Sequence, residues 1–351
     1  MNRILFCGDL IVGDQPVLFG FGLDSIWSKR GYCSIFEEVK EKFEEADYVV
    51  GNLECVVKER NVSDGVSEWS MCCDRNLINA LVTNHINVVS VANNHTMDYG
   101  IECFDAMVKL LVESGTKVIG LREKPYEILD VEGKKIALIG ASYVGKYNKE
   151  KTGFFYSPTK EEWKNLVKDL ADCDYKIAYV HWGNAFISLP TQDQLDQAKE
   201  ITESGIDCII GHHPHILQPS YLVNDKPVVF SLGNFVSDYW QERLRKTNYV
   251  ELQYQPEKPK FYTNACMINK EGAPTLLSNV TEMVCATDLK TSDKKVVFKN
   301  RKIMRREYLI RVISNFWRYK KKSKFIKWAW DRAVYIVKYQ RQEKENPNIL
   351  Y

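Results

Sequence analysis

The sequence predicts an α/β domain with a mostly or partly parallel sheet, followed by a smaller β-rich region. Up to residue 235, short apolar runs alternate with stretches in which apolar residues recur at helical spacing. Strand–helix repeats of this kind are typical of α/β domains. Beyond residue 235, short runs between polar turns predict antiparallel strands instead.

The elements follow from these patterns in chain order. The predicted strands of the first region are the apolar runs at 3–8, 48–52, 88–92, 117–121, 135–142, 176–183, 207–213 and 227–235. Amphipathic stretches between them predict helices at 33–46, 74–85, 101–115, 161–173 and 191–205. Antiparallel strands are expected at 248–255, 260–269 and 295–300. We therefore expect an α/β domain over 1–240, a β-rich extension completing the sheet over 241–300, and a basic, aromatic helical tail over 301–351.

Composition places the chain among ordinary globular proteins. Of its 351 residues, 45% are hydrophobic and 27% charged, and no apolar run approaches the ~20 residues that a transmembrane helix needs. The first residues lack a signal-peptide pattern and are interpreted as a strand. The ten cysteines are scattered without a CxxC pair, which favours free thiols in a reducing cytoplasm over disulfides.

The net charge of +2 conceals an acidic body and a basic end. Residues 301–351 hold 15 Lys and Arg against 4 Asp and Glu, or +11, so the first 300 residues hold 33 against 42, or −9. Residues 315–330 interleave basic residues with Trp, Tyr and Phe, which favours contact with an anionic membrane surface. A helix packed on the domain is the alternative. Nucleic acid is not expected, because no recognised binding module accompanies the patch.

Polar motifs stand where five predicted strands end. They are GD at 8–9, GNLE at 51–54, NNH at 93–95, HWG at 181–183 and GHHPH at 211–215. Loops at the carboxyl ends of strands converge at one edge of an α/β sheet, so we expect these five loops to line one crevice.

Five of the six histidines lie in these loops, namely His95, His181, His212, His213 and His215. Carboxylate and amide residues accompany them, and imidazole with carboxylate suits Zn, Mn or Fe. Singly, each residue has a structural explanation: Asp9 and the two asparagines of NNH could cap helices, and His181 could be a strand-end histidine. His213 and His215 can point to one side if their segment is extended, with Pro214 stiffening the loop.

The order of these motifs resembles one known family. GDLIVG, VVGNLE, VVSVANNHTMDYG, YVHWG, IIGHHPHILQP and VVFSLGNF resemble the CapA family of capsule or poly-γ-glutamate synthesis proteins, over residues 3 to about 236. That family is in turn similar to the calcineurin-like metallophosphoesterases. The resemblance implies a calcineurin-like β-sandwich flanked by helices, with a C-terminal β extension and the basic tail.

The resemblance also implies a role for each motif residue. The implied metal ligands are Asp9, Glu54, Asn94, His181, His213 and His215. Asn52 is the alternative to Glu54, and His212 is a neighbour that is not a ligand. His95 resembles the general acid that protonates a leaving oxygen, and Asp98 would orient it or stabilise its charge. The implied cofactor is one or two divalent ions of Mn, Zn or Fe.

Three positions depart from the family pattern. Ile11 stands where the phosphoesterases have a histidine, Ala185 where the CapA family often has a glutamate, and Asp14 where it often has a basic residue. The N-terminal membrane anchor of most family members is not expected here either. We therefore expect a cytoplasmic protein, either soluble or peripheral at the inner face of the cell membrane.

Two functional hypotheses follow. The first is a metal-dependent hydrolase of phosphoesterase type, acting on an anionic polymer or phosphoester substrate in capsule, poly-γ-glutamate or other surface-polymer production. The second is a non-catalytic or weakly catalytic assembly factor of a membrane polymer synthase, contacted through 301–351. His95 and Asp98 favour the enzyme, whereas Ile11 and Ala185 favour the assembly factor.

Overall fold

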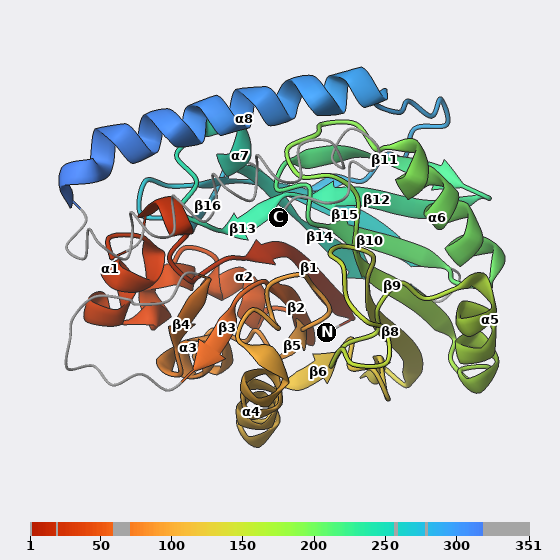
Figure 1. Cartoon of the computed structure of the whole chain (residues 1–351). Coiled ribbons are helices and arrows are strands. Elements are labelled where there is room, and N and C mark those ends of the chain that lie inside the picture. Colours follow the sequence, from red (N-terminus) through yellow and green to blue (C-terminus); the bar gives the residue numbers. More distant parts are fainter. Residues whose placement is uncertain (1, 19, 59–70, 256–258, 278–279, 319–351) are drawn as a thin grey trace.

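Two β-sheets packed face to face, with helices on both outer sides, form the body of the protein (Figure 1). This computed structural model describes residues 2–18, 20–58, 71–255, 259–277 and 280–318. The expected sandwich flanked by helices is confirmed. Both sheets are mixed rather than mostly parallel, because each adds antiparallel strands to a parallel centre.

The first sheet runs in the order β16-β15-β14-β1-β2-β5-β6, with β13 beside β1 and β17 beside β15. Its strands are β1 (Arg3–Leu10), β2 (Tyr48–Leu53), β5 (Val88–Ser90), β6 (Lys117–Ile119), β13 (Asn234–Val236), β14 (Lys246–Gln253), β15 (Lys260–Ile268), β16 (Pro274–Leu276) and β17 (Thr281–Glu282). β14 and β15 are the two extension strands expected near 248–255 and 260–269, and they complete this sheet through β1.

The second sheet runs in the order β11-β12-β10-β9-β8-β7. Its strands are β7 (Tyr126–Val131), β8 (Lys134–Ser142), β9 (Tyr175–His181), β10 (Cys208–His212), β11 (Leu217–Val223) and β12 (Lys226–Leu232). The sequence did not predict β7 or β11. Both are edge strands joined to their neighbours by tight turns, and alternate residues along them are less buried. A small ribbon of β3 (Val56–Lys58) and β4 (Cys72–Asp74) stands apart.

The apolar faces of the two sheets meet in a central core. Ile4 and Phe6 of β1 belong to the same buried cluster as Ile177 and Tyr179 of β9. Beneath the polar loops, the Tyr179 hydroxyl donates to the backbone oxygen of Cys7 at 2.6 Å and so ties the sheets together. Burial of β-branched and aromatic side chains between sheets is what fixes the strand faces.

Helices cover the two outer faces (Figure 1). They are α1 (Leu23–Arg30), α2 (Lys40–Glu44), α3 (Asn76–Thr83) and α4 (Gly100–Glu113) on the first sheet, and α5 (Lys160–Asp169) and α6 (Gln192–Glu203) on the second. Thr159 and Thr191 begin α5 and α6 with capping boxes, in which side chain and backbone satisfy each other's donors. The predicted helix over 33–46 is instead the 3-10 turn η2 (Tyr32–Phe36) and short α2.

The strand predicted at 295–300 is wrong, because these residues begin the helix α8 (Lys294–Asn315). Asp293 caps this helix by accepting a hydrogen bond from the backbone N–H of Val296. Buried positions then recur at helical spacing in Val297, Arg301 and Met304. The Val-Val-Phe run has high β propensity, but packing of one helical face on the domain outweighs it.

α8 crosses the top of the molecule in Figure 1, above β13 and α7 (Glu242–Arg245). The 3-10 turns η1 (Pro16–Leu18) and η4 (Phe316–Arg318) complete the elements used below. Residues 319–351, which include most of the predicted membrane segment 315–330, lie outside the described residues. Throughout the described chain, no helix is both long and apolar enough to cross a membrane. All ten cysteines are free.

Candidate metal centre

The five polar motifs converge at one edge of the sandwich, but from two sheets rather than one. GD, GNLE and NNH follow β1, β2 and β5 of the first sheet, while HWG and GHHPH follow β9 and β10 of the second. Strand register fixes the neighbours: Asp9 lies opposite Asn52 on one side and Asn234 on the other, and His181 lies opposite His212. The crevice expected at one sheet edge is therefore the seam between two sheets.

Asp9 lies at the centre of the first group of contacts. Its carboxylate is fully buried, and Oδ1 accepts a hydrogen bond from Asn52 Nδ2 at 2.7 Å. Oδ2 accepts from the backbone N–H of His213 at 3.3 Å and lies 3.2 Å from His215 Nδ1. Burial alone would raise the pKa of Asp9. The hydrogen bond from His215 and the electrostatic influence of the His215 and His212 rings instead hold this pKa below its ordinary value. Asp9 is thus an ionised carboxylate.

Glu54 is the one acid of the site with unsatisfied oxygens. It is fully buried directly after β2, and neither carboxylate oxygen has a hydrogen-bond partner among the described residues. Its Oε1 lies 3.6 Å from His181 Nε2 and 3.7 Å from His215 Nε2. Burial and the charge of Asp9 raise its pKa well above the ordinary value. A buried carboxyl group surrounded by ring nitrogens but bonded to none costs free energy unless a cation joins them.

Two sets of donor atoms can each surround an ion. Glu54, His181 and His213 form one set, and Asp9, Glu54 and His215 form the other, with the donor atoms of each set within 4.8 Å of one another. Glu54 belongs to both sets and would contact both ions if two were bound. Asn94 adds an oxygen to the first set, since its Oδ1 lies 2.7 Å from His181 Nε2. The residues present therefore fit one or two divalent cations, although their ligand roles remain predictions.

Two imidazoles of this centre, those of His181 and His213, are held neutral. Burial, followed by the neighbouring histidines, lowers the pKa of His181 well below its ordinary value, and burial does the same for His213. A neutral imidazole keeps a ring lone pair that can bind a cation. The side chain of His213 is buried, and its Nδ1 has no hydrogen-bond partner within the described chain.

The GHHPH loop is not extended, so the condition under which its spacing would place both rings on one side is not met. His213 and His215 both have positive φ values, 91° and 55°, and their rings lie 5.3 Å apart. Such backbone is costly for residues other than glycine and persists where the surroundings enforce it. Bonds from the His213 N–H to Asp9 and from His215 Nδ1 to Asn234 supply that constraint. Because the loop is tightly bent, the His213 ring belongs to one set of donor atoms and the His215 ring to the other.

His212 lies beside the ligand sets but in neither of them. Its ring is buried against Tyr179, with centroids 4.0 Å apart, and its Nδ1 lies 3.8 Å from Asp9 Oδ1. Burial lowers its pKa to about 4, with Asp9 acting in the opposite direction. This neutral ring, tilted against Tyr179, fits the expected role of a neighbour of Asp9 rather than a ligand.

His95 and Asp98 form a pair at the mouth of the centre. His95 Nδ1 lies 2.8 Å from Asp98 Oδ2, and its Nε2 lies 4.0 Å from Glu54 Oε1. Because a carboxylate only accepts hydrogen bonds, Nδ1 is the donor and Nε2 faces the ligand sets. The His95 side chain is one-fifth exposed, so a substrate can reach it. A turn in which the Asp98 N–H donates to the backbone oxygen of His95 at 3.2 Å brings the two side chains together.

Three asparagines position the ligands, and the sequence assigned them only weakly. Asn52 Nδ2 lies 3.1 Å from His181 Nδ1 as well as bonding Asp9. Asn93 donates to Asn52 Oδ1 and accepts from the His95 N–H. Asn234 Oδ1 accepts from His215 Nδ1 at 2.9 Å. The proposed helix cap by NNH is wrong, since α4 begins at Gly100 without a side-chain cap. Amides of this kind orient metal ligands.

Ile11 and Ala185, two of the departures from the family pattern, belong to one apolar cluster. Both are buried there with Phe186 and Tyr239, whose rings lie 5.7 Å and 5.6 Å from that of His215. The two polar groups that the pattern expects are thus replaced together by an apolar wall. Asp14 is structural: it is buried and accepts from the backbone N–H groups of Gly20 and Ser25.

Arg301 of α8 is a part of this region that the sequence did not indicate. It is nine-tenths buried and donates to Asn184 Oδ1 at 2.7 Å, and Asn184 is the residue directly after the HWG motif. Its charge contributes to the lowered pKa of His213. No local pattern marks it, because a basic residue in a basic helix is ordinary until the helix is docked.

Comparisons with known proteins agree with the motif order. The model of the bacterial capsule synthesis protein PGA_cap matches residues 3–239. The PGA biosynthesis protein CapA of Bacillus subtilis is 28% identical over 68% of this chain and 66% of its own length. The capsule biosynthesis protein CapA of Bacillus anthracis is 25% identical over 75% of this chain and 68% of its own length. The matched region thus spans about two thirds of each of these relatives.

Among solved structures, the calcineurin-like phosphoesterase YfkN from Bacillus subtilis is similar with a TM-score of 0.43. It is 15% identical in sequence, and the alignment covers 88% of this chain and 98% of that one. The chemistry argued for this centre therefore rests on its own residues.

Proposed function

The chain belongs to the bacterial capsule synthesis family PGA_cap, and from this premise we propose that it is a metal-dependent hydrolase in the production of a cell-surface polymer. Capsule or poly-γ-glutamate is the polymer class, and phosphoester hydrolysis is the reaction that the donor set suits best. One observation carries the proposal: the buried Glu54 carboxylate, without a hydrogen-bond partner in the described chain, is shared by two sets of donors.

The proposed ligands divide into two groups. His181, His213 and Asn94 would hold one divalent ion, Asp9 and His215 the other, and Glu54 would contact both. Ions of Mn, Zn or Fe suit such nitrogen and oxygen donors. A cation bound here supplies Lewis acidity toward a phosphoryl oxygen and neutralises charge that develops on it.

The protein's own proton donor is His95. Asp98 accepts a hydrogen bond from His95 Nδ1–H and so orients the ring, which leaves the Nε2–H directed at the ligand sets. Transfer of that proton to a leaving oxygen is general acid catalysis, which is worth about 10²–10⁴-fold in rate. Asp98 acts through His95 and is a positioning residue.

The proposal is tested by metal content and by hydrolysis of simple phosphomonoesters and phosphodiesters. We expect the purified protein to bind divalent metal, His213→Ala to lose most of it, and His95→Ala to keep it while losing about 10²-fold or more in kcat. His85→Asn is the matched control, since His85 is the one histidine outside the five motif loops and Asn tolerates its φ of 61°. A wild-type protein that takes up no metal under any supplementation would refute the proposal.

The assembly-factor hypothesis is favoured by the apolar wall that contains Ile11 and Ala185. The family pattern has polar side chains at these two positions, so their replacement leaves fewer donor atoms beside His215 for one ion. Tight metal binding without hydrolysis of any tested phosphoester, together with retention of a membrane synthase on the immobilised full-length protein, would support this second function.

We also propose that α8 contacts an anionic membrane surface. Its outward face exposes Leu309, Ile310 and Ile313 among basic residues such as Arg306. Apolar side chains that enter the headgroup region, aided by Lys and Arg, are typical of helices that lie in the membrane interface. A polymer synthase in that membrane would then be within reach of the metal centre.

A further inference from the structure

A cavity of about 380 Å³ lies between α8 and the body of the protein, close to the metal centre. Its walls come from four parts of the chain. They are Leu18, Phe21–Leu23 and Ile26; Ser237–Trp240 and Arg245; the turn Asn269–Gly272; and Arg311 and Arg318 at the end of the α8–η4 segment. This volume falls within the ~300–1,000 Å³ typical of ligand sites. Tyr239 lines the cavity, and its ring is also the one that lies 5.6 Å from the ring of His215.

The cavity carries an excess of positive charge. Arg245, Lys270, Arg311 and Arg318 all line it, and no carboxylate within the described chain forms an ion pair with any of them. Arg245 instead donates from Nε to the backbone oxygen of Ile268 at 2.6 Å. Four cations against two acids, Asp238 and Glu271, leave the wall of the cavity positive on balance, and such a concave wall attracts an anionic ligand.

Two of these arginines lie over aromatic rings. The Arg311 guanidinium lies 5.1 Å from the centre of Trp240, and that of Arg318 lies 4.3 Å from the centre of Phe21. Cation–π contacts of this kind hold a guanidinium in place, and its N–H groups that have no other acceptor remain for an anion. Arg311 Nε is buried and has no hydrogen-bond partner in the described part of the chain, which costs free energy until an acceptor binds.

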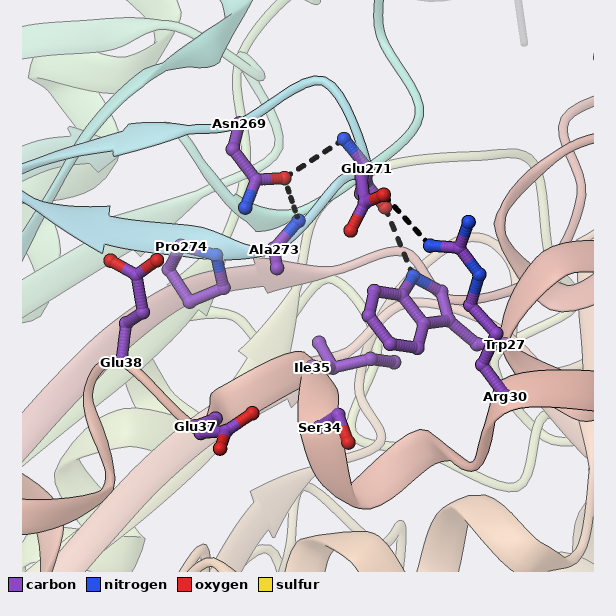
Figure 2. Close-up of a pocket in the computed structure, with 10 residues that line it drawn as sticks. All are labelled: Trp27, Arg30, Ser34, Ile35, Glu37, Glu38, Asn269, Glu271, Ala273 and Pro274. Atoms are coloured by element: carbon purple, nitrogen blue, oxygen red, sulfur yellow. Dashed lines mark hydrogen bonds and ion pairs between the residues drawn. The ribbon is translucent and has the colours of Figure 1, made fainter.

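The two acids that line the cavity form no ion pair with these arginines within the described chain. Figure 2 shows the Glu271 carboxylate directed at Arg30 in the neighbouring pocket, where their ion pair measures 2.8 Å. Asp238 is turned to the backbone, accepting from the N–H groups of Gln15 and Leu23. Burial and the nearby Asp14 raise the pKa of Asp238 to about 7, so its negative charge is reduced at neutral pH.

The neighbouring pocket has the opposite character. Glu37, Glu38 and Glu271 line it together with a single arginine, Arg30 (Figure 2). An anion is repelled there. Of this pair of neighbouring cavities, the one under α8 has the charge for an acidic ligand.

We propose that the cavity under α8 binds the carboxylate groups of an acidic oligomer through Arg311, Arg318 and Arg245. The guanidinium fork matches a carboxylate in two parallel hydrogen bonds, and Lys270 adds unspecific attraction. A chain anchored here passes Tyr239 to reach His215, so the cavity would hold the polymer while a neighbouring unit lies at the metals. This last step rests on the proposed function, whereas the anion site does not.

The test is calorimetric titration of the metal-free, full-length protein with a short γ-linked glutamate oligomer. We expect binding by the wild type and about tenfold weaker binding by Arg311→Gln and by Arg318→Gln, the usual loss for one charged hydrogen bond. Arg306→Gln, which removes the same charge from the exposed side of α8, should bind like the wild type. A γ-linked glutamine oligomer, which has the same backbone without the side carboxylates, should not bind.

Several outcomes would overturn the proposal. They are equal affinity of the wild type and both arginine variants, equal loss in Arg306→Gln, and binding of a glycerol phosphate oligomer in place of the glutamate oligomer. Arg311→Lys, which keeps the charge but not the planar fork, covers the case in which Arg311→Gln fails to fold, and it should also bind more weakly. Hydrolysis of a small phosphoester by the wild type tests the proposed function separately.

Discussion

Glu54→Gln is expected to stabilise the metal-free protein while removing its response to metal. The Glu54 carboxyl group is fully buried next to Asp9, and neither oxygen has a hydrogen-bond partner in the described chain. Glutamine has nearly the same shape and no charge, so it removes the cost of a buried acid beside another acid. A residue kept only for packing would behave in the opposite way, because its substitution would lose stability.

The magnitude follows from that burial without partners. Leaving a buried polar group unsatisfied costs about 1–3 kcal/mol, and we take about 2 kcal/mol as the part of this cost that glutamine removes beside Asp9. With an unfolding entropy of about 2.1 cal/mol/K per residue, this chain unfolds with about 0.7 kcal/mol/K, so the melting temperature rises by about 3 °C. Metal at about 100 times its Kd adds about 2.7 kcal/mol, or about 4 °C, to the wild type alone.

The assay is thermal unfolding in EDTA and then with increasing Mn²⁺ or Zn²⁺. Glu251→Gln is the matched control: Glu251 is buried too, but its Oε1 pairs with Arg3 at 3.4 Å. That variant should lose stability and keep the full metal shift. The reasoning is refuted if Glu54→Gln melts below the wild type in EDTA, or if metal raises its melting temperature as much as that of the wild type.

Three further expectations concern the fold, the pH dependence and the surface. Gly211→Ala should cost about 3 kcal/mol in urea unfolding, because the new Cβ would lie 2.2 Å from the backbone oxygen of Phe230; an unchanged midpoint would contradict the packing below the histidine loop. Burial and Asp14 raise the pKa of Asp238 from its ordinary value of 3.8 to about 7. The contribution of protonated Asp238 to the free energy of unfolding is therefore complete below pH 3.8 and is lost as the pH rises through 7. Between pH 5 and 7.5, the free energy of unfolding from urea titrations should therefore fall by about 3 kcal/mol less in Asp238→Asn than in the wild type. Parallel pH dependences of the two proteins would exclude the raised pKa of Asp238. Ile313→Ser on α8 should bind anionic liposomes about tenfold more weakly, whereas Val112→Ser, at a similarly exposed position on α4, should not; equal sedimentation of both would argue against the membrane surface.

The local patterns of the sequence were sufficient to predict most strands and helices of the sandwich. Strands such as β1 and β9 are apolar runs that end in a polar motif, and helices such as α5 and α6 carry both the helical period and a capping threonine. These signals lie within a few residues of one another, so they can be read without knowing the fold. The failure at 295–300 has the same origin, since a short Val-rich run has no local feature that separates strand from helix.

The sequence by itself determined which residue types stand at the ends of which strands, and hence the donor chemistry of Asp9, Glu54 and the histidines. Only the tertiary structure decided that these donors meet at a seam between two sheets, with Glu54 shared by both sets. It also decided the bent GHHPH backbone, the place of Arg301 and the basic cavity under α8. These features depend on strand register and on contacts between distant segments. Both are set only when the apolar faces of the two sheets pack together, so no periodicity along the chain encodes them.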